Sequence, residues 1–201
     1  MTASAPDGRS LLGRTVRLDR AADPDGEALF AALDDDRVWE MGYAASSPRP
    51  RSADDWRQKM ADALKADRVM YVVRQIDGHG DGRIVGTSSL GDLDLANERA
   101  HLGWTAYTPD VWGSSVNPEC KLLLLGHCFE DRGLMRVKIQ TDSINVRSHA
   151  AIAKLGATRE GVLRRHMKRT DGTWRDSVVF SVIADEWPSV KAGLEARLAA
   201  Q

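Results

Sequence analysis

Cysteines are scarce in this chain, and their spacing excludes a disulfide between them. Cys120 and Cys128 are the only two among 201 residues. Eight positions of a helix separate them by about 12 Å, which is beyond the reach of a disulfide. We therefore expect two buried thiols in a reducing compartment, and with them a cytoplasmic location.

Long apolar runs are also missing, and so are the signals of export and of metal binding. The longest clear apolar run, residues 122–125, is far shorter than the roughly 18 residues that cross a membrane. The amino-terminal residues have no apolar stretch and predict no signal peptide. The histidines form no HExxH motif and do not pair with cysteines. The sequence therefore predicts neither a membrane partner nor a metal ion.

Neither sign of charge is in clear excess. The 28 basic and 29 acidic residues leave a net charge of −1, which excludes the strongly basic surface of a dedicated nucleic-acid-binding protein. The length of 201 residues favours one domain. We expect a flexible tail over residues 1–11 and a single domain over residues 12–201.

What the sequence does contain is a mixture of strand and helix signals. Residues 15–19 and 99–108 alternate as strands do, Asp23-Pro24 and Asn117-Pro118-Glu119 begin helices, and Asp171-Gly172 is typical of a hairpin turn. The predicted order is β-α-α-β-β-β-α-β-α-β-β-α. This α/β (α+β) mixture predicts a central, mostly antiparallel, twisted sheet of about seven strands flanked by helices.

The segment with the most chemical content is a strand, a short Gly/Ser loop and a helix. Alternation places one set of strand residues on a common face: His101, Gly103, Thr105 and Tyr107. The opposite face then carries Leu102, Trp104 and Ala106. The loop can add its N–H groups to those of the helix start, which suits a pyrophosphate. It has neither the Walker A nor the GxGxxG pattern, and on its own it also fits an ordinary turn.

Three long segments carry a resemblance to a known family. They are HLGWTAYTPDVWGSSVNPECKLLLLGHCFE, MRVKIQTDSINVRSHAAIAKLGATREGVLRRH and DGTWRDSVVFSVIADEW. Together, and in this element order, they resemble the GNAT superfamily of acyl-CoA N-acyltransferases, in its RimJ/RimL-like branch, over residues 11–198. The resemblance implies a GNAT-like fold, acetyl-CoA as co-substrate and no metal.

The resemblance also implies where acetyl-CoA binds. The family's loop pattern, Q/R-x-x-G-x-G/A, falls on residues 112–117, with Trp112, Ser115 and Asn117 departing from it. The strand ending at Tyr107 is expected to splay from its neighbour and to bind the pantetheine through its backbone. The implied cofactor-binding residues are Thr105, Ala106, Tyr107, Trp112, Gly113, Ser114, Ser115, Val116, Asn117 and Asn145.

Candidate catalytic groups follow from the same resemblance. His101 stands where the branch carries a Glu, and Ser148 matches a hydroxyl near the thiol. Each has an ordinary alternative: His101 as a half-buried strand residue with water taking the proton, Asn145 as a helix cap alone, and Ser148 as an exposed residue in the first turn. Two aromatic residues are candidates to line the acceptor groove: Trp39 and Tyr43.

The implied reaction is attack of a neutral amine on the thioester. An α-amine has a pKa of about 7.7–8 and a lysine one of about 10.4, so a lysine costs roughly 3–4 kcal/mol more to neutralise at pH 7. We therefore predict acetylation of a protein N-terminal α-amine, of ribosomal-protein type by resemblance. A small-molecule amine (an antibiotic or a polyamine) and a non-catalytic CoA-binding regulatory module remain alternatives, and a homodimer is compatible with the family.

Overall fold

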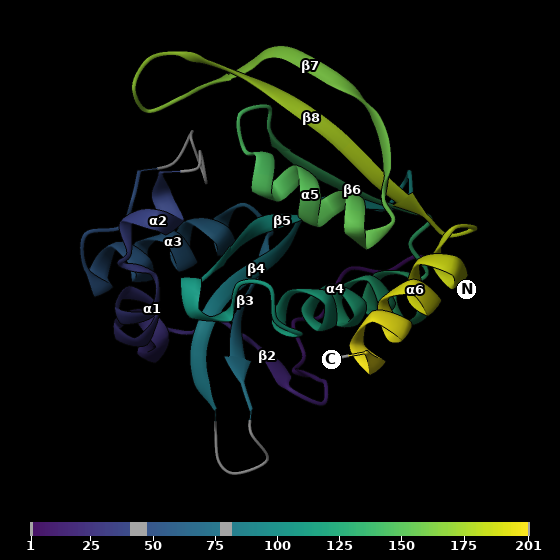
Figure 1. Ribbon diagram of the computed structural model, residues 1–201, viewed down its shortest axis with the longest axis horizontal. Coiled ribbons are helices and arrows are strands. Elements are labelled where there is room, and N and C mark those ends of the chain that lie inside the picture. Colours follow the sequence, from purple (N-terminus) through teal and green to yellow (C-terminus); the bar gives the residue numbers. More distant parts are fainter. Residues whose placement is uncertain (1, 41–47, 77–81, 201) are drawn as a thin grey trace.

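The computed structural model describes residues 2–40, 48–76 and 82–200, and its strands form one mixed sheet. The sheet has eight strands in the order β1-β2-β3-β4-β5-β6-β8-β7, and β5–β6 is its one parallel pair in the described residues (Figure 1). The strands are β1 (Leu11–Leu12), β2 (Val16–Arg20), β3 (Val69–Gln75), β4 (Arg83–Asp94), β5 (Arg99–Tyr107), β6 (Arg136–Asp142), β7 (Thr158–Lys168) and β8 (Trp174–Ile183). The predicted mostly antiparallel sheet is confirmed. The extra strand is β1, whose two residues are too few to show a pattern.

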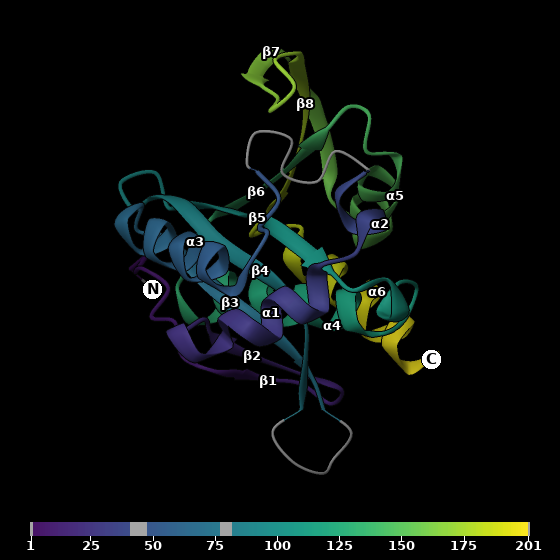
Figure 2. The same ribbon diagram turned by 90° about the vertical axis from the view of Figure 1, so that its left-hand side faces the viewer.

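Helices cover both faces of the sheet. They are α1 (Gly26–Leu33), α2 (Asp36–Trp39), α3 (Ala53–Lys65), α4 (Val116–Gly126), α5 (Val146–Leu155) and α6 (Trp187–Ala199). Helices α4, α5 and α6 pack on one face over the larger core, and α1 and α3 pack on the other over a smaller one (Figures 1 and 2). Strand β3 shows the division, because Tyr71 faces the larger core and Val72 the smaller.

The parallel pair in the middle of the sheet is very short. Strands β5 and β6 pair only through Arg99–Arg136, Ala100–Val137 and His101–Lys138. Beyond these pairs β5 runs on to Tyr107 and β6 to Asp142 without contact in the ladder. The expected splay is therefore present, and it opens toward the ends from which α4 and α5 begin.

A β-bulge in β5 overturns the predicted assignment of its faces. Gly103 pairs with Ser89 but Ala106 with Thr87, so β5 has one residue more than β4 between these pairs. Trp104 takes up the extra length with a φ of +50°. Thr105 consequently faces α4, with Tyr107, while Trp104 shares the face of His101. The alternation was wrong beyond Gly103 because a period of two cannot show a bulge.

The helix after the loop begins and ends differently from the prediction. It starts at Val116, whose N–H donates to the Ser114 hydroxyl over 3.3 Å, so Asn117 is not the cap. It ends at Gly126 and continues as one π-helical turn over His127–Asp131. The two cysteines are free and buried, as predicted.

Residues 2–10, which belong to the tail expected over residues 1–11, contact the rest of the domain in this structure. Their charged side chains pair with the segment after α4: Asp7 with Arg132, and Arg9 with Asp131. The Ser4 N–H also donates to the Arg132 carbonyl over 2.9 Å. The composition of this segment is polar and irregular, so nothing in it predicts these distant partners.

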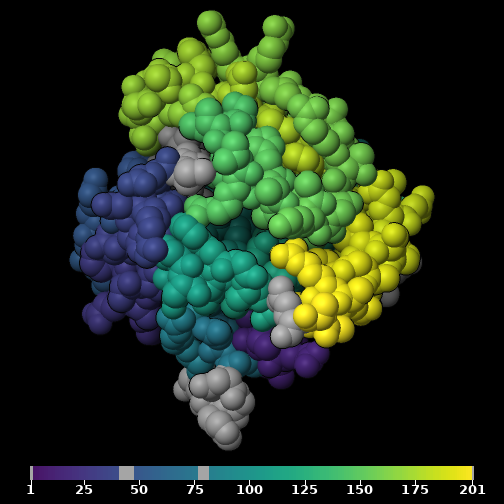
Figure 3. Space-filling model, in the orientation of Figure 1, coloured from purple at the N-terminus to yellow at the C-terminus, as the bar shows by residue number. Residues whose placement is uncertain are grey.

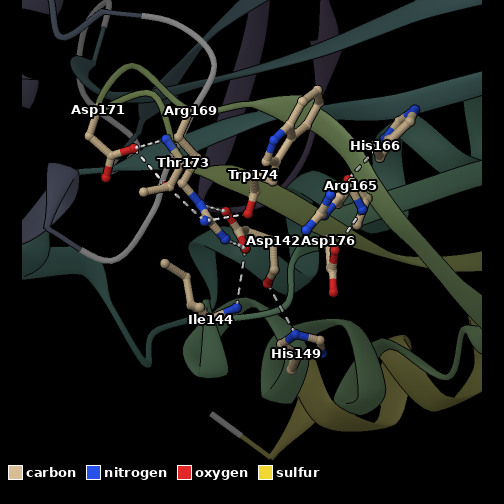
Figure 4. A network of polar contacts seen from close by, with 11 residues as sticks. Asp142, Ile144, His149, Arg165, His166, Arg169, Asp171, Thr173, Trp174 and Asp176 are labelled. Atoms are coloured by element: carbon tan, nitrogen blue, oxygen red, sulfur yellow. Dashed lines mark hydrogen bonds and ion pairs between the residues drawn. The ribbon is translucent and has the colours of Figure 1, made fainter.

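The long β7–β8 hairpin is tied to the end of β6 by one carboxylate (Figure 4). Asp142 is 2% exposed and accepts from both Nε and Nη2 of Arg169, each over 2.8 Å. Burial alone would raise the pKa of Asp142, but the bonds from Arg169 and from the Ile144 N–H outweigh it and hold the pKa below the usual 3.8. The carboxylate is therefore charged and paired at neutral pH.

Asp142→Asn is expected to lower the free energy of unfolding by about 1.5–3 kcal/mol, because it removes the charge that the half-buried Arg169 guanidinium bonds to. Urea unfolding measures the loss, with Asp171→Asn at the exposed hairpin turn as the control. The wild-type contribution is complete above the ordinary pKa and fades as the pH falls toward the lower folded pKa. A loss equal in both variants would contradict a special role of Asp142.

Candidate functional site

The loop before α4 is stabilised by hydrogen bonds from its own side chains to backbone carbonyls. The Trp112 Nε1–H donates to the Tyr107 carbonyl over 2.9 Å, and the Ser114 hydroxyl donates to the Val111 carbonyl over 2.7 Å. Gly113 adopts a φ of +80°, which favours glycine, and a Cβ there would meet nothing within 4 Å. The N–H groups of Gly113 and Ser115 have no hydrogen-bond partner in the described part of the chain. Together with the positive end of α4 they can bind an anion.

Ser115, which stands where the loop pattern has a glycine, has a partner in the turn between β1 and β2. Its hydroxyl lies 3.2 Å from the Thr15 hydroxyl. The buried Glu119 carboxylate accepts from the Thr15 N–H over 2.9 Å, so this turn is fastened to the first turns of α4. The serine is thus part of the support of the loop. The sequence pattern showed Glu119 only as an acid near a helix start.

The start of α5 lies beside the loop. The Asn145 Oδ1 accepts from the Ser148 N–H over 3.0 Å, so the predicted helix cap is confirmed. The Arg147 guanidinium carbon lies 3.4 Å from the centre of the Trp112 ring. Figure 3 shows the surface hollowed between α5, in green, and the loop and start of α4, in teal. The two helix starts therefore face the open end of the splay.

His101 lies at the other end of the splay, on the last paired position of β5. Its Nδ1 is 3.0 Å from an oxygen of Asp92, and the Lys138 ammonium is 3.1 Å from the same oxygen. The ring packs against that of Trp104, with centroids 4.6 Å apart and planes tilted by 47°. It also lies over Gly103, where a Cβ would approach its Nε2 to 2.8 Å. The Nε2 atom is buried and has no hydrogen-bond partner among the residues that the structure describes.

Burial, together with nearby positive charges, keeps the imidazole of His101 neutral. Burial is the largest cause of its lowered pKa, and the positive charges of Lys138 and Arg175 act in the same direction, against the bond to Asp92. That bond and the Lys138 ammonium hold the pKa of Asp92 well below its ordinary value. A charged Asp92 requires the proton on Nδ1, which leaves the lone pair on Nε2. The sequence offered no periodic signal for Asp92 or Lys138.

The remaining candidates lie apart from this centre or outside the described residues. The Trp39 Nε1–H donates to the Leu33 carbonyl over 2.7 Å, and its ring packs 6.4 Å from that of Trp56, beside α1 and α3. Tyr43 lies outside the described residues. Ser148 is half-buried in the first turn of α5. None of the described residues form a cluster of three or more metal-ligating groups, and no described helix is long and apolar enough to cross a membrane.

The sheet splays beside a helix start that can bind an anion, and this arrangement has room for a long phosphorylated ligand. Residues 15–158 match the Acetyltransferase (GNAT) domain family, and the chain belongs to that family. It is an N-acetyltransferase by membership, and GNAT domains use acetyl-CoA as the acyl donor.

Relatives and solved structures agree with this assignment. A Bacillus subtilis protein named "Putative ribosomal N-acetyltransferase YdaF" is 25% identical over 183 residues, 88% of this chain and 94% of that protein. A GCN5-related N-acetyltransferase from Brucella melitensis superposes with a TM-score of 0.88 at 26% identity, over 98% of this chain and 88% of that one. Mycobacterium smegmatis RimJ in complex with CoA-disulfide shares the fold, with a TM-score of 0.77 at 22% identity, over 90% and 88% of the two chains.

Proposed function

We propose that this protein transfers the acetyl group of acetyl-CoA to the α-amine of a protein N-terminus. The observation that carries the proposal is the neutral His101. Its Nε2 lone pair is buried with no partner in the described residues, and its tautomer is fixed by Asp92. The name of the YdaF relative, which refers to ribosomal N-acetylation, supports a protein acceptor. The RimJ/RimL-like resemblance of the sequence points the same way.

The cofactor site is proposed to extend from the loop into the splay. The free N–H groups of Gly113 and Ser115, at the start of α4, would hold the pyrophosphate. The backbone of residues 105–107 has no strand partner on the β6 side and would bind the pantetheine amides. Asn145 would donate from its amide NH2 to the pantetheine, because its oxygen already accepts a hydrogen bond in the helix cap. The bound donor supplies a thioester carbonyl at the base of the splay.

His101 is proposed to accept the proton of the attacking amine on Nε2. Asp92 fixes the ring, and a neutral imidazole can take a proton directly or through one water. Because the pKa of His101 is lowered, this base is better matched to an α-amine than to a lysine, which is roughly 3–4 kcal/mol harder to neutralise. The pKa argument and the site thus favour the same acceptor. Ser148 is proposed to lie near the leaving thiolate.

Thiol release in the presence of acetyl-CoA tests the acceptor class. The acceptors are a lysine-free peptide with a free N-terminus, the same peptide with a blocked N-terminus and one lysine, and a polyamine. We expect release only with the first. Faster release with the polyamine or the lysine peptide would contradict the proposal, and no release with any amine would favour a non-catalytic CoA-binding module.

The Asn145→Ala variant is expected to lose both stability and affinity for acetyl-CoA. The missing cap should lower the free energy of unfolding by about 1 kcal/mol, and the missing amide should weaken acetyl-CoA binding. Asn145→Asp is the matched control, because it keeps a cap oxygen but has no N–H to donate. We expect Asp to restore stability without restoring affinity in calorimetry. Unaltered affinity in both variants would reduce Asn145 to a helix cap.

A further inference from the structure

Strand β8 carries a buried guanidinium that the proposed reaction does not use. Arg175 is 8% exposed, and within the described part of the chain its Nε has no hydrogen-bond partner. Burial is the largest cause of the lowered pKa of Arg175. Buried arginines are normally paired, because an isolated charge away from water is costly.

The carboxylate that acts on Arg175 is already engaged by another arginine. Asp142 is held by two nitrogens of Arg169, each at 2.8 Å, and Figure 4 shows this pair with the hairpin above it. Asp142 raises the pKa of Arg175 and Arg169 lowers it. Asp142 is therefore hydrogen-bonded to Arg169 and acts on Arg175 through its charge alone among the described contacts.

Arg175 shares a face of the sheet with His101. His101 of β5 lies opposite Lys138 of β6. Four residues further along β6, Asp142 lies opposite Ser177 of β8. Arg175 is two residues from Ser177 on β8. The alternation of strands places all of these on the face away from Ile139 and Phe180, which pack in the larger core beneath α4 to α6. The positive charge of Arg175 contributes to the lowered pKa of His101, so the two side chains are close enough to interact electrostatically.

A third group on this face also lacks a partner. The Gln140 Oε1 is buried and accepts no hydrogen bond from residues 2–40, 48–76 or 82–200. Gln140 lies between positions 138 and 142 of β6. The face therefore presents a lone pair at His101, an acceptor at Gln140 and a charged donor at Arg175. Such a row is complementary to a chain with an amine at one end, N–H groups in the middle and an anion beyond them.

We propose that Arg175 binds a carboxylate of the acceptor, supplied by an acidic side chain at the second or third position of the acetylated N-terminus. The inference rests on the proposed function. Arg175 lies two residues beyond the Asp142–Ser177 pair, so its backbone is about 20 Å along the strands from position 138. The long Arg175 side chain shortens the path, which leaves a separation on the order of 13 Å. An extended peptide covers about 3.3–3.6 Å per residue, so the α-carboxylate of a single amino acid is too close to its own amine.

Paired peptides test the proposal. Lysine-free pentapeptides with Asp or Glu at the second and third positions are compared with matched Asn or Gln peptides, using wild type, Arg175→Gln and Arg175→Lys. We expect wild type to prefer the acidic peptide at least tenfold in kcat/KM, mainly through KM. Arg175→Gln should reduce the ratio to below twofold, and Arg175→Lys should retain part of it.

Arg164→Gln is the control for general surface charge. Arg164 is exposed on β7, and its replacement removes one positive charge from the same hairpin. This variant should therefore keep both the activity and the preference for the acidic peptide. An equal loss of preference in Arg164→Gln, or a preference unchanged in Arg175→Gln, would overturn the proposal. So would a lack of preference in wild type.

Two further measurements separate this inference from the proposed function. The N-acetylated acidic and amide peptides, which are products, are titrated calorimetrically: the acidic one should bind wild type at least tenfold more tightly than Arg175→Gln. Urea midpoints should not fall in Arg175→Gln, because an unpaired charge is removed, whereas an arginine with a structural role would destabilise on removal. If no peptide accepts acetyl, the proposed function fails; if only the acid dependence is absent, this inference fails.

Discussion

Replacing His101 by alanine is expected to lower kcat by about 100-fold or more, with the folded state retained. General bases contribute roughly 10²–10⁴-fold, and the alanine variant leaves the proton of the amine to water. The measurement is the rate of thiol release with a peptide that has a free N-terminus, at saturating acetyl-CoA. His101→Glu should recover part of the rate, because a carboxylate on this face can take the same proton. Wild-type kcat in His101→Ala would leave His101 as a packing residue.

The pH profile identifies the base independently of the size of the loss. Ionisation of an α-amine acceptor bends kcat/KM near pH 8 in every variant. The pKa of His101 is lowered from 6.5, so the protonated, inactive form accumulates only below that pH. We therefore expect a second acid bend below pH 6.5 in wild type and its absence in His101→Ala. Asp92→Asn should move this bend to lower pH, because the carboxylate supports the charged imidazole.

Gly113→Glu is expected to weaken acetyl-CoA binding by about 100-fold or more. A carboxylate about 4 Å from the pyrophosphate costs roughly 4 kcal/mol at the effective dielectric of a protein surface, and 1.4 kcal/mol is a factor of ten. No atom lies within 4 Å of the position where the new Cβ would stand, so the fold has room for the side chain. Calorimetric titration with acetyl-CoA measures the loss, which should shrink at high salt.

Gly113→Ala is the matched control for backbone strain. Both variants place a side chain at a φ of +80°, which costs roughly 1–2 kcal/mol, but only the glutamate adds charge. We expect the alanine variant to bind acetyl-CoA within a few-fold of wild type. Equal affinity of Gly113→Glu and wild type would show that the loop does not hold the phosphates.

The elements that the sequence predicted well are those with local signals. Asn145 caps α5, Gly156 ends it with a φ of +91°, and the Asp171-Gly172 turn joins β7 to β8. Each of these is decided by the conformation and hydrogen bonds of a few neighbouring residues. Features that depend on distant partners were not predicted. The contacts of Asp7 with Arg132 and of Glu119 with the β1–β2 turn are of this kind.

The candidate site shows the same division. The resemblance brought His101 and the loop to attention, but the bulge at Trp104 moved Thr105 to the other face from His101. Asp92 and Lys138, which fix the imidazole, come from two different strands that flank β5. Only strand pairing brings these side chains together, so a reading along the chain cannot find them.

Only three residue pairs connect β5 to β6, so the sheet consists of two blocks with a short connection between them. Strands β1 to β5 form one antiparallel block and β6 to β8 another, and this short seam joins their backbones. Resistance to hinging is therefore lowest along the seam, and the two blocks are expected to open as separate units in native-state hydrogen exchange. A molecule bound along the splay would bridge them. Amide protection on both sides of the seam should then rise together, so that binding at one edge stiffens strands that the ligand does not touch.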